Sequence, residues 1–488
     1  MKTPDHSLGD IPADVFRKHL HEVADWIADY REKIGELPIS SNAKPGAIRA
    51  QLPAEAPEKA ESLDAIMEDF RRVIFPGITQ WAHPQFMGYF GATTTGPGIL
   101  AEMLAAAVNV NAMTWRTSPA ATELETVVLG WLQQWLGLPN EFSGVVYDTA
   151  SIGTMHALAA AREEAGTSVR TLGLSGRSEL PIFRIYASDQ AHSSVDKAAI
   201  ALGLGEHNVR RIPSDSEFKM DVSALRETIA ADLRKEFQPL AVIATVGTTS
   251  TASADPVKEI AKVCREHQMW LHIDAAYGGG LALLPECEWV KDRWPECDSL
   301  VMNPHKMLFV PFDFSALYVR DIKRLRDVFT LVPEYLRGDA SQAEINYMDY
   351  GVQLGRRFRA LKAWMVWRTF GREGLTARIR EHQRLAQLFT KWIKEDPRFE
   401  LSAPTVMPVV CFRFKAADDA ASDKLNSQLV EKINAGGKTY LMQTKLKGRT
   451  VMRLGLGNLL TTEEHLRRVW EIIQDTASAQ PAVAAAKA

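Results

Sequence analysis

SLVMNPHK, residues 299–306, joins a short apolar run to a lysine across a single proline. Small and apolar residues in succession are typical of a buried strand, and the proline fixes the backbone directly after it. Lys306 therefore projects from a constrained turn at the end of a strand. An amine in that position can form an imine with an aldehyde cofactor if its pKa is depressed. The alternative is a solvated surface charge, which is the usual state of a lysine.

Further short apolar runs alternate with helical stretches on either side of this segment. They lie at 144–147, 183–187, 240–246, 270–273 and 316–319. Strands that alternate with helices predict an α/β domain with a mostly parallel sheet. Ligands bind such sheets where strands end and helices begin, so the polar residues at those junctions are the candidates for chemistry.

HIDAA, residues 272–276, supplies a second candidate, because its aspartate closes the strand that begins at 270. A buried carboxylate among small and apolar neighbours is costly without a cationic partner. A protonated pyridine nitrogen is such a partner, and the pair keeps the ring an electron sink. The alternative is that Asp274 caps the helix that follows.

Two further turns follow predicted strands. TASIGT, residues 149–154, offers free amides and hydroxyls before a helix expected from about 154, a pattern that binds phosphate. DQAHSS, residues 189–194, places His192 where it either stacks on a flat ring or simply begins a helix. Neither turn identifies a site by itself. Together with Lys306 and Asp274, they supply an amine, an acid, a phosphate site and a ring partner.

The combination of NPHK, DQAHSSV and HIDAAY carries a specific family resemblance. The chain resembles the group II pyridoxal-phosphate decarboxylases of fold type I, and within them is similar to the aromatic L-amino-acid decarboxylases, from about Trp81 to Arg372. The resemblance implies an α/β, fold type I transferase-like architecture. Its parts are a large domain with a mostly parallel seven-stranded sheet, a small C-terminal α/β domain and a helical N-terminal segment. It also implies pyridoxal 5'-phosphate as cofactor and decarboxylation of an L-amino acid to the amine and carbon dioxide.

The resemblance gives roles to individual residues. Lys306 would form the Schiff base, Asp274 would pair with the pyridine nitrogen, and His192 would stack on the ring. The other implied cofactor contacts are Ala150, Ser151, Thr249, Ala276, Asn303 and His305. Tyr335 matches the tyrosine of the family's mobile catalytic loop, and it completes the catalytic set with Lys306 and His192. Residues 337–341, RGDAS, have no strand or helix pattern, which independently indicates a loop.

The resemblance also places the substrate side chain in a pocket formed by Trp81, Tyr89, Phe90, Asn111 and Met113. We therefore expect an aromatic substrate: tryptophan, tyrosine, phenylalanine or Dopa. Asn111 and Met113 stand where the animal enzymes carry a larger apolar residue and an aromatic one, so the preferred side chain stays open. Family members that release aldehyde tend to replace His192 or Tyr335, and both are present, so amine formation is expected. Aldehyde synthesis and decarboxylation of a non-aromatic amino acid are the alternatives.

Composition limits the partners and the location. The 488 residues include 57 lysines and arginines against 60 aspartates and glutamates, with a formal charge of -3 and no basic stripe, so nucleic acid is not an expected partner. Neither a signal peptide nor a membrane-spanning apolar run is found, which predicts a cytoplasmic protein without a membrane partner. The four cysteines are widely spaced, so reduced thiols and no metal site are expected.

The chain is too long for one compact core, so several regions are expected. They are an N-terminal helical segment (1–85), a large cofactor-binding domain (86–375), a small C-terminal domain (376–476) and a disordered tail (477–488). Helices are predicted after an N-cap at Ser118 and near 354–370. The apolar helices of residues 11–80 lack a core of their own, and the family builds its sites across two subunits, so a homodimer is expected.

Other functions compete with this interpretation. Ser151, Asp274 and His305 follow in the order that α/β-hydrolases use, but Thr149 stands where their nucleophile turn needs glycine. Arg453 either holds a carboxylate, as in aminotransferases, or forms an ion pair on the surface of the small domain. A non-catalytic scaffold is disfavoured because all the chemical positions are filled.

Overall fold

A seven-stranded sheet forms the centre of the computed structural model, which describes residues 9–41, 43–91, 93–331 and 344–479. Its strands are β1 (Ser143–Tyr147), β2 (Phe183–Ser188), β3 (Val209–Ile212), β4 (Gln238–Thr245), β5 (Trp270–Asp274), β6 (Ser299–Met302) and β7 (Ser315–Val319). They lie in the order β1-β7-β6-β5-β4-β2-β3. β7 runs antiparallel to both of its neighbours, whereas the strands from β6 to β3 pair in parallel. This confirms the predicted mostly parallel sheet.

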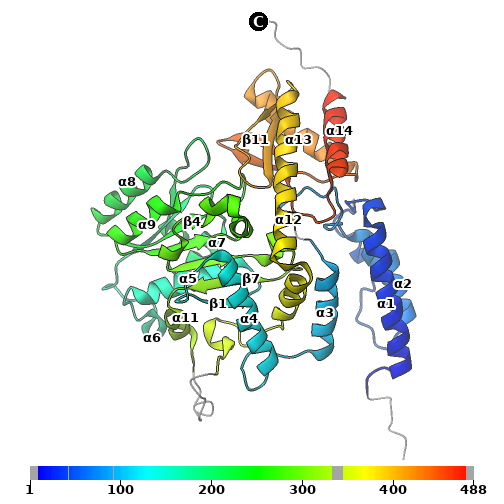
Figure 1. The fold of residues 1–488 in the computed structure, drawn as a ribbon, viewed down its shortest axis with the longest axis horizontal. Coiled ribbons are helices and arrows are strands. Elements are labelled where there is room, and N and C mark those ends of the chain that lie inside the picture. The colour runs from blue at the N-terminus through cyan, green and yellow to red at the C-terminus, as the bar shows by residue number, and fades with distance from the viewer. Residues whose placement is uncertain (1–8, 42, 92, 332–343, 480–488) are drawn as a thin grey trace, which may run out of the picture.

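Helices pack around this sheet (Figure 1). Those in contact with its strands are α4 (Pro119–Leu136), α5 (Ala150–Glu164), α7 (Ser194–Ala201), α8 (Val222–Leu233), α9 (Val257–Glu266), α10 (Pro304–Met307) and α11 (Ile322–Phe329). The short α6 (Val169–Leu172) contacts α5. Every residue of β5, β6 and β7 is buried, as expected for strands covered on both faces. The polar residues that follow β4, β5 and β6 therefore meet at one edge of an apolar sheet.

The N-terminal helices form a separate layer at one side of the molecule (Figure 1). α1 (Ala13–Lys33) lies beside α2 (Leu63–Asp69), where Lys18 donates to Asp64 at 3.2 Å. The Trp26 ring of α1 packs on the helical turns after α2, 5.1 Å from the ring of Phe70 and 5.2 Å from that of Phe75. α3 (Gly96–Val108) contacts the long helix α12 (Ala360–Glu395). Phe16, Leu20 and Ile66 stay exposed. The predicted helical N-terminal segment is confirmed.

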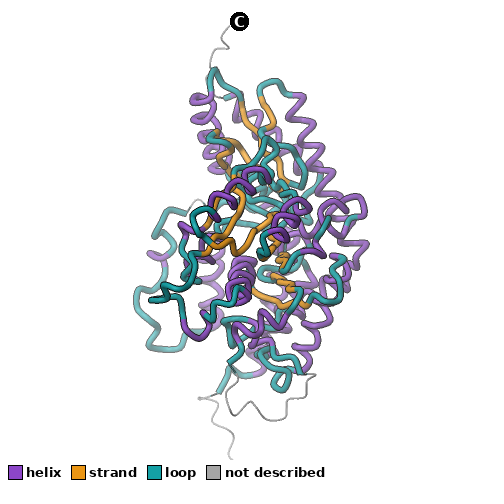
Figure 2. Tube along the Cα trace, turned by 90° about the vertical axis from the view of Figure 1, so that its left-hand side faces the viewer, coloured by secondary structure: helices purple, strands orange, loops and turns teal. Residues whose placement is uncertain are grey.

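A small C-terminal domain follows the long helix α12 (Ala360–Glu395), which bends at Gly371 with a φ of +60°. Its antiparallel sheet has the order β10-β11-β9-β8, formed by β8 (Phe399–Leu401), β9 (Val409–Phe414), β10 (Met442–Leu446) and β11 (Arg449–Gly455). Its two helices, which pack on each other, are α13 (Asp419–Ala435) and α14 (Glu463–Ser478). Figure 2 shows this sheet above the large one. The predicted small α/β domain is confirmed.

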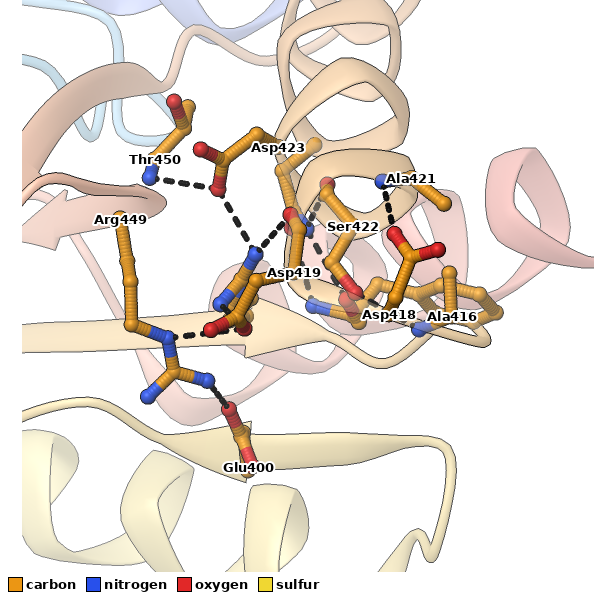
Figure 3. Close-up of polar contacts among 12 residues, drawn as sticks. Glu400, Ala416, Asp418, Asp419, Ala421, Ser422, Asp423, Arg449 and Thr450 are labelled. Atoms are coloured by element: carbon orange, nitrogen blue, oxygen red, sulfur yellow. Dashed lines mark hydrogen bonds and ion pairs between the residues drawn. The ribbon is translucent and has the colours of Figure 1, made fainter.

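Ion pairs join the start of α13 to the small sheet (Figure 3). The buried Arg413 of β9 donates to carboxylate oxygens of Asp419 and Asp423, at 2.7 Å each. Arg449 of β11 donates to Asp419 at 3.1 Å and to Glu400 at 2.6 Å. Three strands, β8, β9 and β11, and one helix therefore share a single polar network.

Several local expectations need correction. α5 begins at Ala150 rather than near 154, because the small residues there let the helix pack closely on the sheet. Ser118 holds the N-cap position of α4, but its hydroxyl donates to the carbonyl of Asn111 at 2.5 Å. The helix predicted near 354–370 begins later, at Ala360, and Gly371, whose φ of +60° is not helical, separates it from a second helix that continues to Glu395. The expected tail also begins later, because α14 extends to Ser478 and buries Ala477.

Further expectations concern the domain boundary, the end of the chain, the cysteines and membrane-spanning helices. The predicted domain boundary at 375 falls inside α12 and stays a prediction, whereas residues 480–488 lie outside the described residues. All four cysteines are free thiols, as the spacing predicted, and all four are also buried. In the part of the chain that the structure describes, each helix is too short or too polar to cross a bilayer.

Candidate active site

A cavity of about 440 Å³ lies at the ends of β4, β5 and β6, where the start of α5 and the strands β10 and β11 approach the large sheet. All nine residues that the sequence assigned to the cofactor line it: Ala150, Ser151, His192, Thr249, Asp274, Ala276, Asn303, His305 and Lys306. The structure thus brings together residues from five separate segments of the chain.

Lys306 lies in the single helical turn α10, directly after β6. Its Nζ is 4.6 Å from the centroid of the Phe90 ring. Burial lowers the pKa of this amine to about 8, and Asp274 opposes that shift while Arg453 adds to it. An amine with this pKa is partly unprotonated near neutral pH, which attack on an aldehyde requires. The interpretation of Lys306 as a solvated surface charge is therefore wrong.

Asp274 ends β5 and is 6% exposed. Its Oδ1 accepts a hydrogen bond from the amide of Ala276 at 3.0 Å. The next helical turn starts at Gly278, with Tyr277 in the N-cap position, so Asp274 does not cap it. The second carboxylate oxygen is left for a cation in the cavity, which is what a buried carboxylate requires.

One end of the cavity has the donors that an anion needs. The amides of Ala150 and Ser151 lie in the first turn of α5, where backbone N–H groups lack helical partners and attract negative charge. His305 Nδ1 accepts from the amide of Phe314 at 3.0 Å. Burial, with the nearby Lys306, lowers the pKa of His305 to about 3, so the ring stays neutral and its hydrogen lies on Nε2. Two amides and one imidazole N–H are therefore available to a phosphate.

His192 and Thr249 lie in the turns after β2 and β4 and line the same cavity. The Nδ1 of His192 accepts from the amide of Ser194 at 3.1 Å, which fixes the orientation of the ring. Although His192 is exposed, partial desolvation lowers its pKa, so the ring is neutral near pH 7. A neutral, oriented imidazole is suited to stacking on a flat ring. The side chains of His192 and Thr249 are both accessible to a ligand in the cavity.

Four buried polar atoms on the cavity wall have no hydrogen-bond partner among the described residues: Thr245 Oγ1, Tyr277 Oη, Asn303 Oδ1 and Arg453 Nη2. Each such group costs roughly 1–3 kcal/mol, and native proteins rarely leave several together. A polar ligand in the cavity would supply the partners. Pyridoxal phosphate fits these residues, because its phosphate, ring nitrogen and aldehyde match the start of α5, Asp274 and Lys306.

Arg453 is 5% exposed, so the alternative of a surface ion pair is wrong. Its Nε donates to the carbonyl of Ser250 at 2.9 Å, and its Nη1 donates to the carbonyl of Tyr89 at 2.6 Å. The guanidinium carbon lies 4.6 Å from the Phe90 ring, and the Tyr277 ring lies 3.9 Å from the same ring. The sequence reasoning missed Tyr277 and the small-domain residues of the wall, which are Met442, Gln443 and Thr444.

The residues expected to hold a substrate side chain are divided in the single chain. Tyr89 and Phe90 line the cavity, and the Trp81 ring stacks on Tyr89 at 4.9 Å without lining it. Asn111 and Met113 lie elsewhere: the Asn111 Oδ1 accepts from the amide of Arg356 at 2.9 Å, beside α3. The assignment of these two residues to the substrate stays a prediction. Tyr335 lies outside the described residues.

The hydrolase alternative fails on geometry. Ser151, Asp274 and His305 all line the cavity, but no hydrogen bond joins any two of them in the described part of the chain. The Nδ1 of His305 instead accepts a hydrogen bond from the amide of Phe314. A triad requires that nitrogen for the acid that orients the base.

Known proteins are similar to this chain in sequence and in fold. Residues 45–415 match the family model for the pyridoxal-dependent decarboxylase conserved domain. Tyrosine decarboxylase 2 of Narcissus pseudonarcissus is 38% identical over 486 residues, which cover 97% of this chain and 96% of the relative. Phenylacetaldehyde synthase of Arabidopsis thaliana is 36% identical over 483 residues, 96% of this chain and 97% of the relative. The crystal structure of Oryza sativa TDC with PLP and tryptamine has a TM-score of 0.92 at 36% identity, covering 97% of this chain and 99% of that chain.

Proposed function

Because the chain belongs to the pyridoxal-dependent decarboxylase family, we propose that it converts an aromatic L-amino acid to the amine and carbon dioxide, with pyridoxal 5'-phosphate as cofactor. One observation carries the proposal: a half-buried amine (Lys306), a buried carboxylate (Asp274) and a helix start suited to an anion (Ala150) line one cavity. When bound, pyridoxal phosphate supplies an aldehyde for covalent attachment and a ring that accepts the electrons of a breaking bond.

Each residue on the cavity wall would have its own role in the reaction. Lys306 would hold the cofactor covalently, and Asp274 would keep a proton on the ring nitrogen. Arg453 Nη2 and the Tyr277 hydroxyl are unpartnered donors on the same wall, and they are available to the carboxylate of the amino acid. Burial raises the pKa of Tyr277, so this hydroxyl stays protonated and can donate a hydrogen bond.

The aromatic substrate is supported by the wall of the cavity and by the relatives. Tyr89 and Phe90 present rings to the cavity, and a further ring, Trp81, stacks behind Tyr89. The relative from Narcissus pseudonarcissus is a tyrosine decarboxylase, and the Oryza sativa structure contains tryptamine. The test is a screen of amino acids with the holoprotein, in which amine and carbon dioxide are measured together. Turnover confined to aliphatic or acidic amino acids would contradict the aromatic assignment.

Aldehyde synthesis is a second candidate, because a phenylacetaldehyde synthase is 36% identical to this chain. We favour the amine, since this chain keeps His192 and Tyr335, the positions where aldehyde-forming members of the family tend to differ. Oxygen uptake during turnover separates the two outcomes. Aldehyde, ammonia and hydrogen peroxide in place of amine would establish the second candidate.

A homodimer is also part of the proposal. α3 exposes Leu100 (55%), Leu104 (52%) and Val108 (62%) in one stripe, since residues four apart share a helix face. The N-terminal helices expose further apolar residues, and such surfaces mark interfaces. Sedimentation velocity tests this, and a fully active monomer would contradict it. The expected cytoplasmic location stays a proposal that cell fractionation tests.

A further inference from the structure

Behind the cavity, a buried row of polar side chains joins β5 and β6 to α5. His272, Ser299 and Thr154 are each 0% exposed. The Nε2 of His272 lies 3.2 Å from Thr154 Oγ1, and its Nδ1 lies 2.9 Å from Ser299 Oγ. The indole nitrogen of Trp270 donates to the same Ser299 Oγ at 2.8 Å. Polar groups in an apolar sheet are costly, and this row satisfies each ring nitrogen.

One hydrogen bond joins the ring of His272 to each of its two hydroxyl neighbours. The indole N–H of Trp270 can only donate, so Ser299 accepts from it. Burial lowers the pKa of His272 to about 4, which keeps the ring neutral, with one nitrogen that donates and one that accepts. The hydroxyls of Ser299 and Thr154 can take either complementary role. In both tautomers a hydrogen bond therefore joins His272 to Thr154 on α5.

The row joins the two elements that carry the ends of the proposed cofactor site, which are β5 with Asp274 and α5 with Ala150. His272 precedes Asp274 by two positions on β5, so both side chains point to the same face of the sheet. Thr154 follows Ala150 by four positions on α5, so both lie on the same side of the helix. Gly153 lies between Ala150 and Thr154 in the sequence, and a Cβ on it would come within 2.9 Å of Val301 Cγ2. This distance shows how closely α5 packs on β6.

We propose that His272 is a positioning residue that sets the distance between Asp274 and the start of α5. Asp274 would hold the ring nitrogen of the cofactor, and Ala150 and Ser151 would hold its phosphate. The inference rests on the proposed function, because it presumes that the cavity binds pyridoxal phosphate. His272 does not line the cavity, so it acts through Thr154 and α5. Sites that hold a rigid ligand at two ends are sensitive to such supporting contacts.

Paired substitutions separate the contact to the helix from the contact to the strand. His272→Gln places an amide donor where Nε2 lies, whereas His272→Asn keeps a polar atom near Nδ1 and cannot reach Thr154. Thr154→Val removes the hydroxyl at similar volume, and Thr154→Ser keeps it. The readout is the dissociation constant of pyridoxal phosphate, obtained by absorbance titration of the cofactor-free protein.

We expect His272→Asn and Thr154→Val to weaken cofactor binding by about tenfold or more. His272→Gln and Thr154→Ser should remain within about threefold of the parent. The double variant His272→Asn/Thr154→Val should bind no more weakly than the worse single variant, because both changes remove one bond. Unfolding of the cofactor-free variants in urea shows whether a loss of affinity merely follows a loss of folded protein, and that result would overturn the inference.

Parent-like affinity in His272→Asn, or equal weakening by Gln and Asn, would also overturn it. The failure of the proposed function looks different. In that case the parent chain itself shows no saturable binding of pyridoxal phosphate and no turnover, whatever stands at position 272.

Discussion

At the scale of single residues, Lys306 unites a lowered pKa with a position on the cavity wall. Lys306→Ala is expected to abolish amine formation and to remove the visible absorbance of the holoprotein, since no other lysine among the described residues lines the cavity. Lys306→Arg is the control, because it keeps a positive charge that cannot form an imine. Retained turnover in Lys306→Ala would end the assignment.

Asp274 acts on the cofactor through charge. Asp274→Asn keeps an oxygen for the amide of Ala276 and removes the negative charge. We expect turnover to fall by about a hundredfold or more, because loss of one preorganised electrostatic partner has effects of that size. Absorbance titration should show that the cofactor still binds. Normal turnover in this variant would mean that the aspartate only orders its turn.

Tyr335 is placed by resemblance alone, since it lies outside the described residues. A tyrosine hydroxyl can deliver the proton that the substrate carbon needs after carbon dioxide leaves, before oxygen attacks. Tyr335→Phe should therefore lower amine formation by about a hundredfold or more and start oxygen consumption, with release of aldehyde, ammonia and hydrogen peroxide. An oxygen electrode and amine chromatography measure both. Amine at the parent rate without oxygen uptake would remove Tyr335 from the mechanism.

The residues that sequence could identify share one property: each stands at the end of a strand or a few residues beyond it, in a recognisable motif. Lys306, Asp274 and His192 were predicted in this way, and the structure places all three on one cavity. Arg453 and Met442 come from the small domain, and only the docking of that domain brings them to the cavity. An arginine within the apolar run of β11 was the one available signal. It could not say which surface the guanidinium would face.

At the scale of elements, the apolar runs predicted six strands of the large sheet, and the resemblance supplied the seventh. That strand, β3, reads VRRI and lies at the sheet edge. Two arginines interrupt its apolar run, because an edge strand can expose side chains that a central strand cannot. The start of α5 was also predicted wrongly, since the helix begins at Ala150 and not near 154. Its small residues have no strong periodicity, so the sequence pattern does not mark its first turn, which packs closely on β6.

The polar network of the small domain yields a prediction about an element (Figure 3). Arg413 has a buried side chain, and it joins β9 to Asp419 and Asp423 of α13. Arg413→Met should lower the free energy of unfolding by about 1–3 kcal/mol, since hydrogen bonds to charged groups are lost. Arg449→Met is the matched control: its side chain is 46% exposed, so the change should cost less than about 1 kcal/mol. Equal effects in urea unfolding would show that burial adds nothing here.

At the scale of the whole molecule, the site forms where three parts of the chain meet: the segment 86–91, the large sheet and the small domain. Residues 86–91 lie against the small domain: the amide of Met87 donates to the carbonyl of Tyr440 at 3.0 Å, and that of Gly455 donates to Met87 at 2.9 Å. A Cβ on Gly91 would come within 2.8 Å of the backbone of Gly457. Position 91 therefore suits glycine, because two segments far apart in the chain make a close contact there.

Buried histidines spread through both domains couple the folded state to pH. Burial lowers the pKa of His83, His156, His272 and His382 to about 4. A folded-state pKa below the unfolded value near 6.5 means that unfolding takes up protons in acid. The stability is therefore fully present above about pH 6.5 and is lost as the pH falls towards 4.

His156 gives this prediction its sharpest test, because neither ring nitrogen has a hydrogen-bond partner among the described residues. Its ring packs 4.7 Å from Tyr147 and 4.6 Å from Phe329. His156→Leu should flatten the fall in unfolding free energy between pH 7 and 4 by roughly 3 kcal/mol. Urea unfolding at one fixed protein concentration measures it, with the exposed His207→Gln as control. An unchanged pH slope in His156→Leu would show that this ring is not among the groups that take up protons on unfolding.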